Sequence, residues 1–310
     1  MIEIFKTEEG KIKKVSRFEE NCWINLTRPT SEEIEELSKR MNIPLNFLAD
    51  PLDINERARI EIDNGFALIV LRIPHFDKKN KEIPFITLPL GIVFNKDIFI
   101  TLCSEENEVI SDFIMGRIKN FQTGKKDRFI LQIFLKTAHW YLKYLKQINE
   151  RTTSFEKELH RSIENEALIK LLNIEKSLVF FTTSLRSNEL MMERLQRTEI
   201  IKPNPDNEDL LEDVIIENRQ AIEMANIYSK VLSGMMDAFA SVISNNLNVV
   251  VKALTSITII LMIPTLVASI YGMNVRLPFE YSPYAFIYIV AISFVLSAIG
   301  VFIFIRRKWF

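Results

Sequence analysis

Polar residues recur along one face of a long helical segment near the carboxyl end of the chain. When residues are placed at 100° intervals around a helix axis, the members of this face fall within an arc of about 120°. They are Asp237, Ser241, Ser244, Asn248, Val251, Thr255, Thr258, Met262, Thr265 and Ser269, and we call this face the polar stripe. Ser and Thr alone are common where membrane helices pack together. The continuation through Asn248 to Asp237 favours a surface that meets water or polar partners, because each polar residue makes membrane insertion more costly.

Neutral amides and hydroxyls on such a face suit a cation that keeps its hydration shell. Mg²⁺ is small, holds its waters tightly and is usually bound with several of them retained. The span 253–270 contains no Asp, Glu, Lys or Arg, whereas a pore that strips an ion of its water would need strong oxygen ligands such as carboxylates or a cage of carbonyls. Asn274 places an amide carbonyl beyond the outer end of this span and Asn248 places one near its inner end. Gly272 suits a left-handed residue that ends the helix and turns Asn274 toward a central axis.

Two apolar runs are long enough to cross a lipid bilayer. The run 253–270 carries no charge and has about the length that a bilayer core requires, and a second uncharged run covers 284–305. The first run continues a helical pattern over 207–271 that only Gly234 and Pro264 interrupt. Two helices per chain cannot enclose a water-filled path, so we expect several copies around a cyclic axis.

The charges that flank these runs predict their orientation. Lys252 precedes the first run, and the basic tail 306–310 follows the second. The positive-inside rule therefore places both termini in the cytoplasm and the loop 272–283 outside the cell. We expect a multi-pass protein of the plasma membrane.

Apolar residues form a second line along the part of the long helix that precedes the membrane, with a spacing of about 3.5 residues. They are Leu211, Ile215, Ile222, Ala225, Leu232, Met236, Phe239, Ile243 and Val250, with Asn218, Ser229 and Asn246 on the same line, here called the seam. A helix of this length needs partners for its seam, so the spacing predicts oligomerisation.

The amino-terminal part predicts a mixed α/β domain over 1–104. Runs rich in β-branched and aromatic residues predict strands at 22–26, 65–73, 86–94 and 97–103. Thr30 and Glu33 have capping-box spacing and predict the start of a helix. The region 105–200 has a charged helical pattern that predicts helical arms, and two prolines within 201–207 end it. The predicted fold class is an α+β domain followed by long α-helices and two transmembrane helices.

The composition excludes several classes of function. The formal net charge is −1, and no basic patch with interleaved aromatics indicates nucleic-acid binding. Cys22 and Cys103 are expected to be buried free thiols and not a disulfide or a metal site. His75, His139 and His160 are scattered, and we find no phosphate loop or nucleophile–base motif, so the sequence does not predict an enzyme. The first residues lack the pattern of a cleaved signal peptide.

The end of the first apolar run carries a resemblance to a known family. "YGMN" at 271–274, followed by a short loop, a second apolar run and a basic end, resembles the CorA family of magnesium transporters. "SGMMDAFASVISNNLN" at 233–248 resembles the stem of that family, "WINLT" at 23–27 its amino-terminal strand, and "RRKWF" its tail. The resemblance covers most of the chain and implies a funnel-shaped homopentamer with a cytoplasmic α/β domain.

The resemblance also implies roles for residues of the membrane part. Gly272, Met273 and Asn274 would form an outer selectivity ring. Asn248, Met262 and Thr265 would line the pore, with Asp237 in the vestibule below, and all four lie on the polar stripe together with Val251 and Thr255. The loop 272–283 departs from the family pattern, because Glu280 stands beside Arg276 where many members have an acidic segment.

A regulatory metal site is implied as well. Asp50 and Asp213 match acids that bind a cation between neighbouring cytoplasmic domains of the family, so intracellular Mg²⁺ would hold the ring closed. Taken alone, Asp213 also fits a solvated charge on a helix, and Asp50 the start of a turn. Ala49 precedes Asp50 where the family often has paired acids, which places the strength of this site in question.

Together these features predict passive transport of Mg²⁺, with Co²⁺ and Ni²⁺ as further candidates. A divalent cation gains roughly 4.6 kcal/mol per 100 mV of membrane potential, so uptake needs no ATP site. Two alternatives stay open. A Zn²⁺ transporter of the same family is disfavoured because neither apolar run contains Cys or His. A membrane-anchored sensor or interaction protein is disfavoured because an anchor has no use for the polar stripe.

Overall fold

The computed structural model describes residues 1–161, 165–198, 205–274, 278 and 282–307. The chain forms two compact units, Met1–Gly234 and Met235–Phe310. Most of the predicted loop 272–283, including Arg276 and Glu280, lies outside the described residues, as do 201–204 and the last three residues of the tail.

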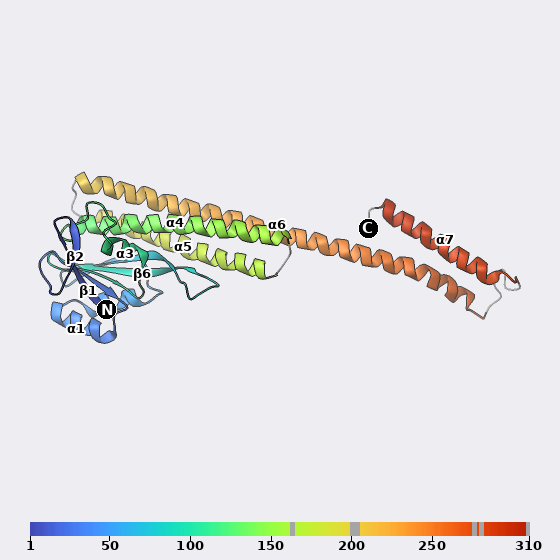
Figure 1. Ribbon diagram of the computed structural model, residues 1–310, viewed down its shortest axis with the longest axis horizontal. Coiled ribbons are helices and arrows are strands. Elements are labelled where there is room, and N and C mark those ends of the chain that lie inside the picture. The colour runs from blue at the N-terminus through green and yellow to red at the C-terminus, as the bar shows by residue number, and fades with distance from the viewer. Residues whose placement is uncertain (162–164, 199–204, 275–277, 279–281, 308–310) are drawn as a thin grey trace. The chain divides into compact units, whose positions relative to one another are not determined.

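A seven-stranded sheet forms the centre of the amino-terminal unit (Figure 1). Its strands are β1 (Ile2–Glu8), β2 (Lys11–Val15), β3 (Trp23–Thr27), β4 (Arg59–Asp63), β5 (Phe66–Phe76), β6 (Phe85–Phe94) and β7 (Phe99–Cys103). The strand order is β2-β1-β3-β7-β6-β5-β4. Only β3 and β7 pair in parallel, and the other neighbours are antiparallel. The predicted strands are confirmed as β3, β5, β6 and β7.

The strands that were predicted are those whose two faces are both covered. In β5, Leu68 and Val70 belong to an apolar cluster on one face of the sheet, and Ile69 and Leu71 belong to a cluster on the other. Successive side chains of a strand point to opposite faces, so a strand covered on both sides reads as a continuous apolar run. The strands β1, β2 and β4 carry many charged residues and were missed.

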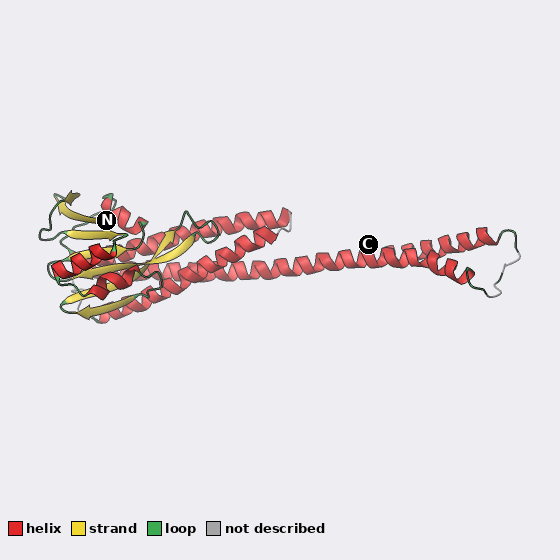
Figure 2. Ribbon diagram, turned by 90° about the horizontal axis from the view of Figure 1, so that it is seen from below, coloured by secondary structure: helices red, strands yellow, loops and turns green. Residues whose placement is uncertain are grey.

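Helices cover both faces of this sheet (Figure 2). The helices α1 (Ser31–Met41) and α2 (Leu45–Ala49), followed by the 3-10 turn η1 (Asp50–Leu52), pack on one face. The capping box that starts α1 is confirmed: the Glu33 amide donates to Thr30 Oγ1 at 3.2 Å, and the Thr30 amide donates to Glu33 Oε2 at 3.0 Å. The other face is covered by α3 (Glu108–Ile114), α4 (Lys126–Arg161) and α5 (Asn165–Arg197).

The predicted long helix is present as α6 (Pro205–Tyr271), and the second apolar run forms α7 (Ala285–Arg306). Both are long and apolar enough to cross a membrane. The prediction that the whole seam needs other copies is wrong for its first part, which packs inside the chain. Ile222, Ala225 and Leu232 are buried, and the Asn218 side chain donates to the Leu185 carbonyl of α5 at 3.5 Å. The reason is that α5 returns alongside this part of α6.

Candidate functional site

The helix α7 packs on one face of α6 within the carboxyl-terminal unit. The α6 residues that this packing buries or half-buries are Ala253, Ser256, Ile260, Ile263 and Val267. At Gly300 of α7 an added Cβ would lie 3.3 Å from Cδ1 of Ile263 and 4.0 Å from Cγ1 of Ile260, so the two helices approach closely there. On a helix with 100° per residue these covered positions lie on the side opposite the polar stripe.

The polar stripe is therefore uncovered in the single chain. Every one of its members from Asp237 to Ser269 is exposed. Met262 and Val251, the apolar members, are 63% and 51% exposed. A polar face that its own chain leaves open on a membrane-length helix is available to water or to other copies of the chain.

Three of the six hydroxyls of the stripe donate their hydrogens to their own helix. Ser241 Oγ donates to the Asp237 carbonyl at 3.0 Å, Thr258 Oγ1 to that of Leu254 at 2.8 Å, and Thr265 Oγ1 to that of Leu261 at 3.2 Å. A hydroxyl has one hydrogen and two acceptor lone pairs. The bonds to the preceding turn use the hydrogens, so the oxygens face outward as acceptors. Such a row can accept hydrogen bonds from the waters that surround a cation.

The residues that end α6 do not adopt the predicted left-handed turn. The Gly272 amide continues the helical pattern by donating to the Ala268 carbonyl at 2.9 Å, and the Met273 amide closes a tighter turn onto Ile270 at 3.3 Å. Gly272 does not have a positive φ, so the left-handed prediction is wrong. The helix ends by tightening its last turn, and Met273 and Asn274 are both exposed beyond it.

Asp50, predicted as a regulatory ligand, is engaged inside its own chain. It lies at the start of η1, and its Oδ2 is 2.7 Å from Nη2 of Arg59 on β4. Arg59 also contacts Glu56 through Nη1 and Glu61 through Nε, the latter at 3.2 Å. Burial lowers the pKa of the Arg59 guanidinium, but these carboxylates outweigh burial and hold the pKa above its usual value. Arg59 was not singled out in the sequence, although acids follow and precede it closely in "DINERARIEID".

Asp213 is an exposed residue of α6. Within the part of the chain that the structure describes, no three His, Cys, Asp or Glu side chains gather closely enough to hold a metal ion. A cation bound by Asp50 or Asp213 would therefore take further ligands from water or from another copy. Cys22 and Cys103 are free and buried, as predicted, and burial raises the pKa of the Cys103 thiol to about 11.

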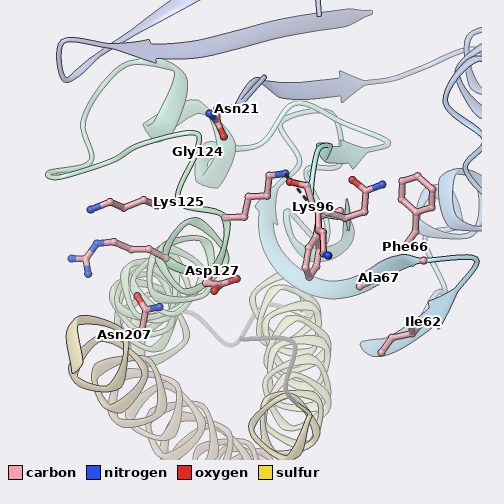
Figure 3. A pocket seen from close by; sticks show the side chains of 14 residues that line it. Asn21, Ile62, Phe66, Ala67, Lys96, Gly124, Lys125, Asp127 and Asn207 are labelled. Atoms are coloured by element: carbon pink, nitrogen blue, oxygen red, sulfur yellow. Dashed lines mark hydrogen bonds between the residues drawn. The ribbon is translucent and has the colours of Figure 1, made fainter. Parts of the chain in front are cut away.

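A separate cavity of about 690 Å³ opens in the amino-terminal unit (Figure 3). It is lined by the β4–β5 and β6–β7 turns and the start of α4, and its charged residues are Lys96, Lys125, Lys126, Asp127 and Arg128. The Lys126 ammonium donates to the Asn95 carbonyl at 3.1 Å, and burial lowers the pKa of this ammonium. None of the residues predicted for the pore or the regulatory site lines this cavity.

Comparisons with known proteins agree over nearly the whole chain. The family described as CorA-like Mg²⁺ transporter protein matches residues 18–307. The cobalt/magnesium transport protein CorA of Methanocaldococcus jannaschii is 29% identical, with 97% of this chain and 95% of that protein covered. The protein of the same description from Thermotoga maritima is 23% identical, with 93% and 83% covered. The complete structure of the CorA magnesium transporter from Methanocaldococcus jannaschii matches with a TM-score of 0.86 and 27% identity, covering 100% of this chain and 99% of that one.

Proposed function

Because the chain belongs to the family of CorA-like Mg²⁺ transporter proteins, we propose that it conducts hydrated Mg²⁺ across the cell membrane. The family is one of transporters and not of enzymes. The observation that carries the proposal is the uncovered polar stripe on α6, which α7 leaves open along the whole membrane span. Co²⁺ is a second candidate cargo, because the relatives from Methanocaldococcus jannaschii and Thermotoga maritima are described as cobalt/magnesium transport proteins.

The polar stripe forms hydrogen bonds with the waters that surround the ion. Thr258 and Thr265 use their hydroxyl hydrogens within α6, so their oxygens accept hydrogen bonds from ion-bound waters. Asn248 offers an amide carbonyl for the same purpose at the inner end. No fixed charge stands in the membrane part of the stripe to trap the ion, and membrane potential supplies roughly 4.6 kcal/mol per 100 mV for a divalent cation. Conduction is passive and directed into the cytoplasm.

Several copies, five by the family resemblance, place their stripes around one axis. In this ring Gly272, Met273 and Asn274 form the outer filter, where Asn274 orders the waters of the incoming ion. Thr255, Met262 and Val251 line the path below, and Asp237 attracts the cation into the vestibule. Support comes from the exposure of all these residues in the single chain. Both termini of each copy lie in the cytoplasm, as the flanking charges predict.

Intracellular Mg²⁺ closes the path by binding at Asp50 and Asp213 between neighbouring copies. A ligand that binds the closed arrangement more tightly shifts the population toward it. Arg59 already pairs with Asp50, so Mg²⁺ must compete with this guanidinium for the carboxylate. We infer that the closing response needs a higher Mg²⁺ concentration than an unpaired Asp50 would require.

The test is ion flux into liposomes that contain the purified protein. Mg²⁺, Co²⁺, Ni²⁺ and Zn²⁺ are supplied in turn, with an imposed inside-negative potential, with none, and with a pH gradient alone. Potential-driven uptake of Mg²⁺ is expected. Uptake that follows the pH gradient and prefers Zn²⁺ would favour the zinc alternative, and no uptake of any cation by correctly inserted protein would remove the proposal.

A further inference from the structure

Pro264 interrupts the hydrogen bonding of α6 inside the membrane span. It stands within the helix, and proline has no amide hydrogen to donate to the carbonyl four residues earlier. The carbonyl of Ile260 therefore lacks the donor that any other residue at 264 would supply. Prolines in membrane helices are tolerated where a neighbouring helix, a hydroxyl or a water satisfies the freed carbonyl.

Ser297 of α7 has a hydrogen-bond donor without an acceptor, whereas the Ile260 carbonyl is an acceptor that lost its usual donor. Its Oγ is buried and has no hydrogen-bond partner among the described residues. Other hydroxyls of the two membrane helices donate to their own helix: Ser256 Oγ to the Lys252 carbonyl at 2.8 Å, and Ser293 Oγ to that of Ile289 at 2.9 Å. A buried hydroxyl without a hydrogen-bond partner destabilises the folded protein. We therefore expect Ser297 Oγ to find an acceptor outside its own helical turn.

Ser297 and Ile260, whose carbonyl loses its usual donor to Pro264, line one groove. Ile260, Pro264 and Ser297 all border a cavity of about 670 Å³ between α6 and α7, whose remaining lining is almost entirely apolar. A cavity of this size leaves room for the helices to approach each other. Ser293 borders the same groove but already has its partner.

We propose that Ser297 is a positioning residue for the pore helix: its hydroxyl donates to the Ile260 carbonyl when α6 straightens at Pro264 and closes the groove. Pro264 lies on the groove side, and its ring clashes with the carbonyl of the preceding turn, so a bend at this residue moves α6 away from α7. Only the straighter of these two arrangements of α6 holds the hydrogen bond. The half of the polar stripe beyond Pro264, with Thr265 and Ser269, moves with the bend. The inference rests on the proposed function, because the bend of α6 affects Mg²⁺ flux only if α6 lines a conducting pore.

The first test compares two variants of nearly equal shape. Ser297→Thr keeps a hydroxyl, and Ser297→Val replaces it with a methyl group. Hydrogen bonds between membrane helices have modest strength, so Val should lower potential-driven Mg²⁺ flux about three- to fifteen-fold while Thr stays near wild type. Ser293→Ala is the matched control, and its flux should stay within about two-fold of wild type because its hydroxyl serves only its own helix.

The second test asks whether the effect passes through Pro264. Pro264→Ala restores the amide that bonds the Ile260 carbonyl, so Ser297→Val should change nothing further in that background. An equal loss of flux from Ser297→Val with and without Pro264, or equal flux in the Val and Thr variants, would overturn the proposal.

A third measurement does not depend on transport. Spin labels at Leu254 and Leu266, exposed residues on either side of Pro264, report the bend of α6 when labelled chains are diluted into unlabelled ones. Both labels lie on the side of α6 away from α7, so closing the groove moves them apart. The Thr variant should retain a longer-distance population that the Val variant loses. Identical distance distributions would refute the positioning role even if the protein conducted no Mg²⁺, whereas absent wild-type flux alone would refute only the proposed function.

Discussion

Arg59 should set the Mg²⁺ concentration at which the cytoplasmic part responds. Its Nη2 lies 2.7 Å from Oδ2 of Asp50, which is the place that a divalent cation bound to this carboxylate would take. Arg59→Gln removes the positive charge and keeps a polar side chain. The cation could then reach the carboxylate without displacing or being repelled by a guanidinium.

The magnitude follows from the charges and their separation. A divalent cation and a guanidinium about 5 Å apart repel each other by about 1.7 kcal/mol in the dielectric of bulk water. The side chains of Arg59 and Asp50 are 27% and 36% exposed. Partial burial strengthens this repulsion, and salt in the solvent screens part of it. Since each 1.4 kcal/mol is about a factor of ten in affinity, the substitution should lower the half-maximal Mg²⁺ concentration about ten-fold.

The assay is limited proteolysis of the full-length protein over a Mg²⁺ titration. Lys39→Gln is the control, because it removes one positive charge from an exposed pair with Glu35 (3.6 Å) on α1. The midpoint of protection should move to lower Mg²⁺ in Arg59→Gln and stay in place in Lys39→Gln. An unchanged midpoint in a normally folded Arg59→Gln protein would refute the competition, and equal shifts in both variants would show an effect of overall charge.

Further predictions concern the filter, the pore face and the regulatory acid. Asn274→Ala should abolish or strongly reduce Mg²⁺ flux without disturbing assembly, because the outer amide that orders the ion's waters is lost; normal flux would remove that role. Cysteines at Thr265 and Asn248 should react with water-soluble thiol reagents while one at Ile260, on the face toward α7, should not, and equal reactivity at all three would contradict a single pore-lining face. Asp213→Lys places a fixed positive charge where a cation would bind, so the variant should keep its protease protection when Mg²⁺ is removed. Equal loss of protection in wild type and variant would make Asp213 a plain surface charge.

Features that depend on neighbours along the chain were predictable. The membrane spans follow from uninterrupted apolar runs, and the polar stripe follows from the helical period, since both involve residues within a few turns of each other. The capping box of Thr30 and Glu33 is likewise local and is present as predicted. Strands buried on both faces, such as β5, were predictable because burial on both sides makes every residue apolar.

The edge strand β2 and its neighbour β1 were not predictable in the same way. In β1 and β2 the side chains pair across strands as Lys6 with Lys13 and Glu8 with Lys11, and neither strand has a continuous apolar run. Their place in the sheet depends on pairing with β3 and with each other. A short charged segment of this kind fits a loop as well as a strand, and only its pairing with neighbouring strands distinguishes the two.

The sequence by itself determined the class of the protein: an α+β domain, a long helix with a polar stripe, and two membrane helices. The tertiary structure decided which side of α6 is covered by α7, that Asp50 pairs with Arg59, and that Ser297, Ile260 and Pro264 border one groove. It also decided that α6 ends in a tight turn at Gly272. The physical reason is that periodicity is a property of one segment, whereas the packing of one helix on another, ion pairing and burial each require two segments to meet. The spacing of residues within either segment does not tell which other segment it will contact.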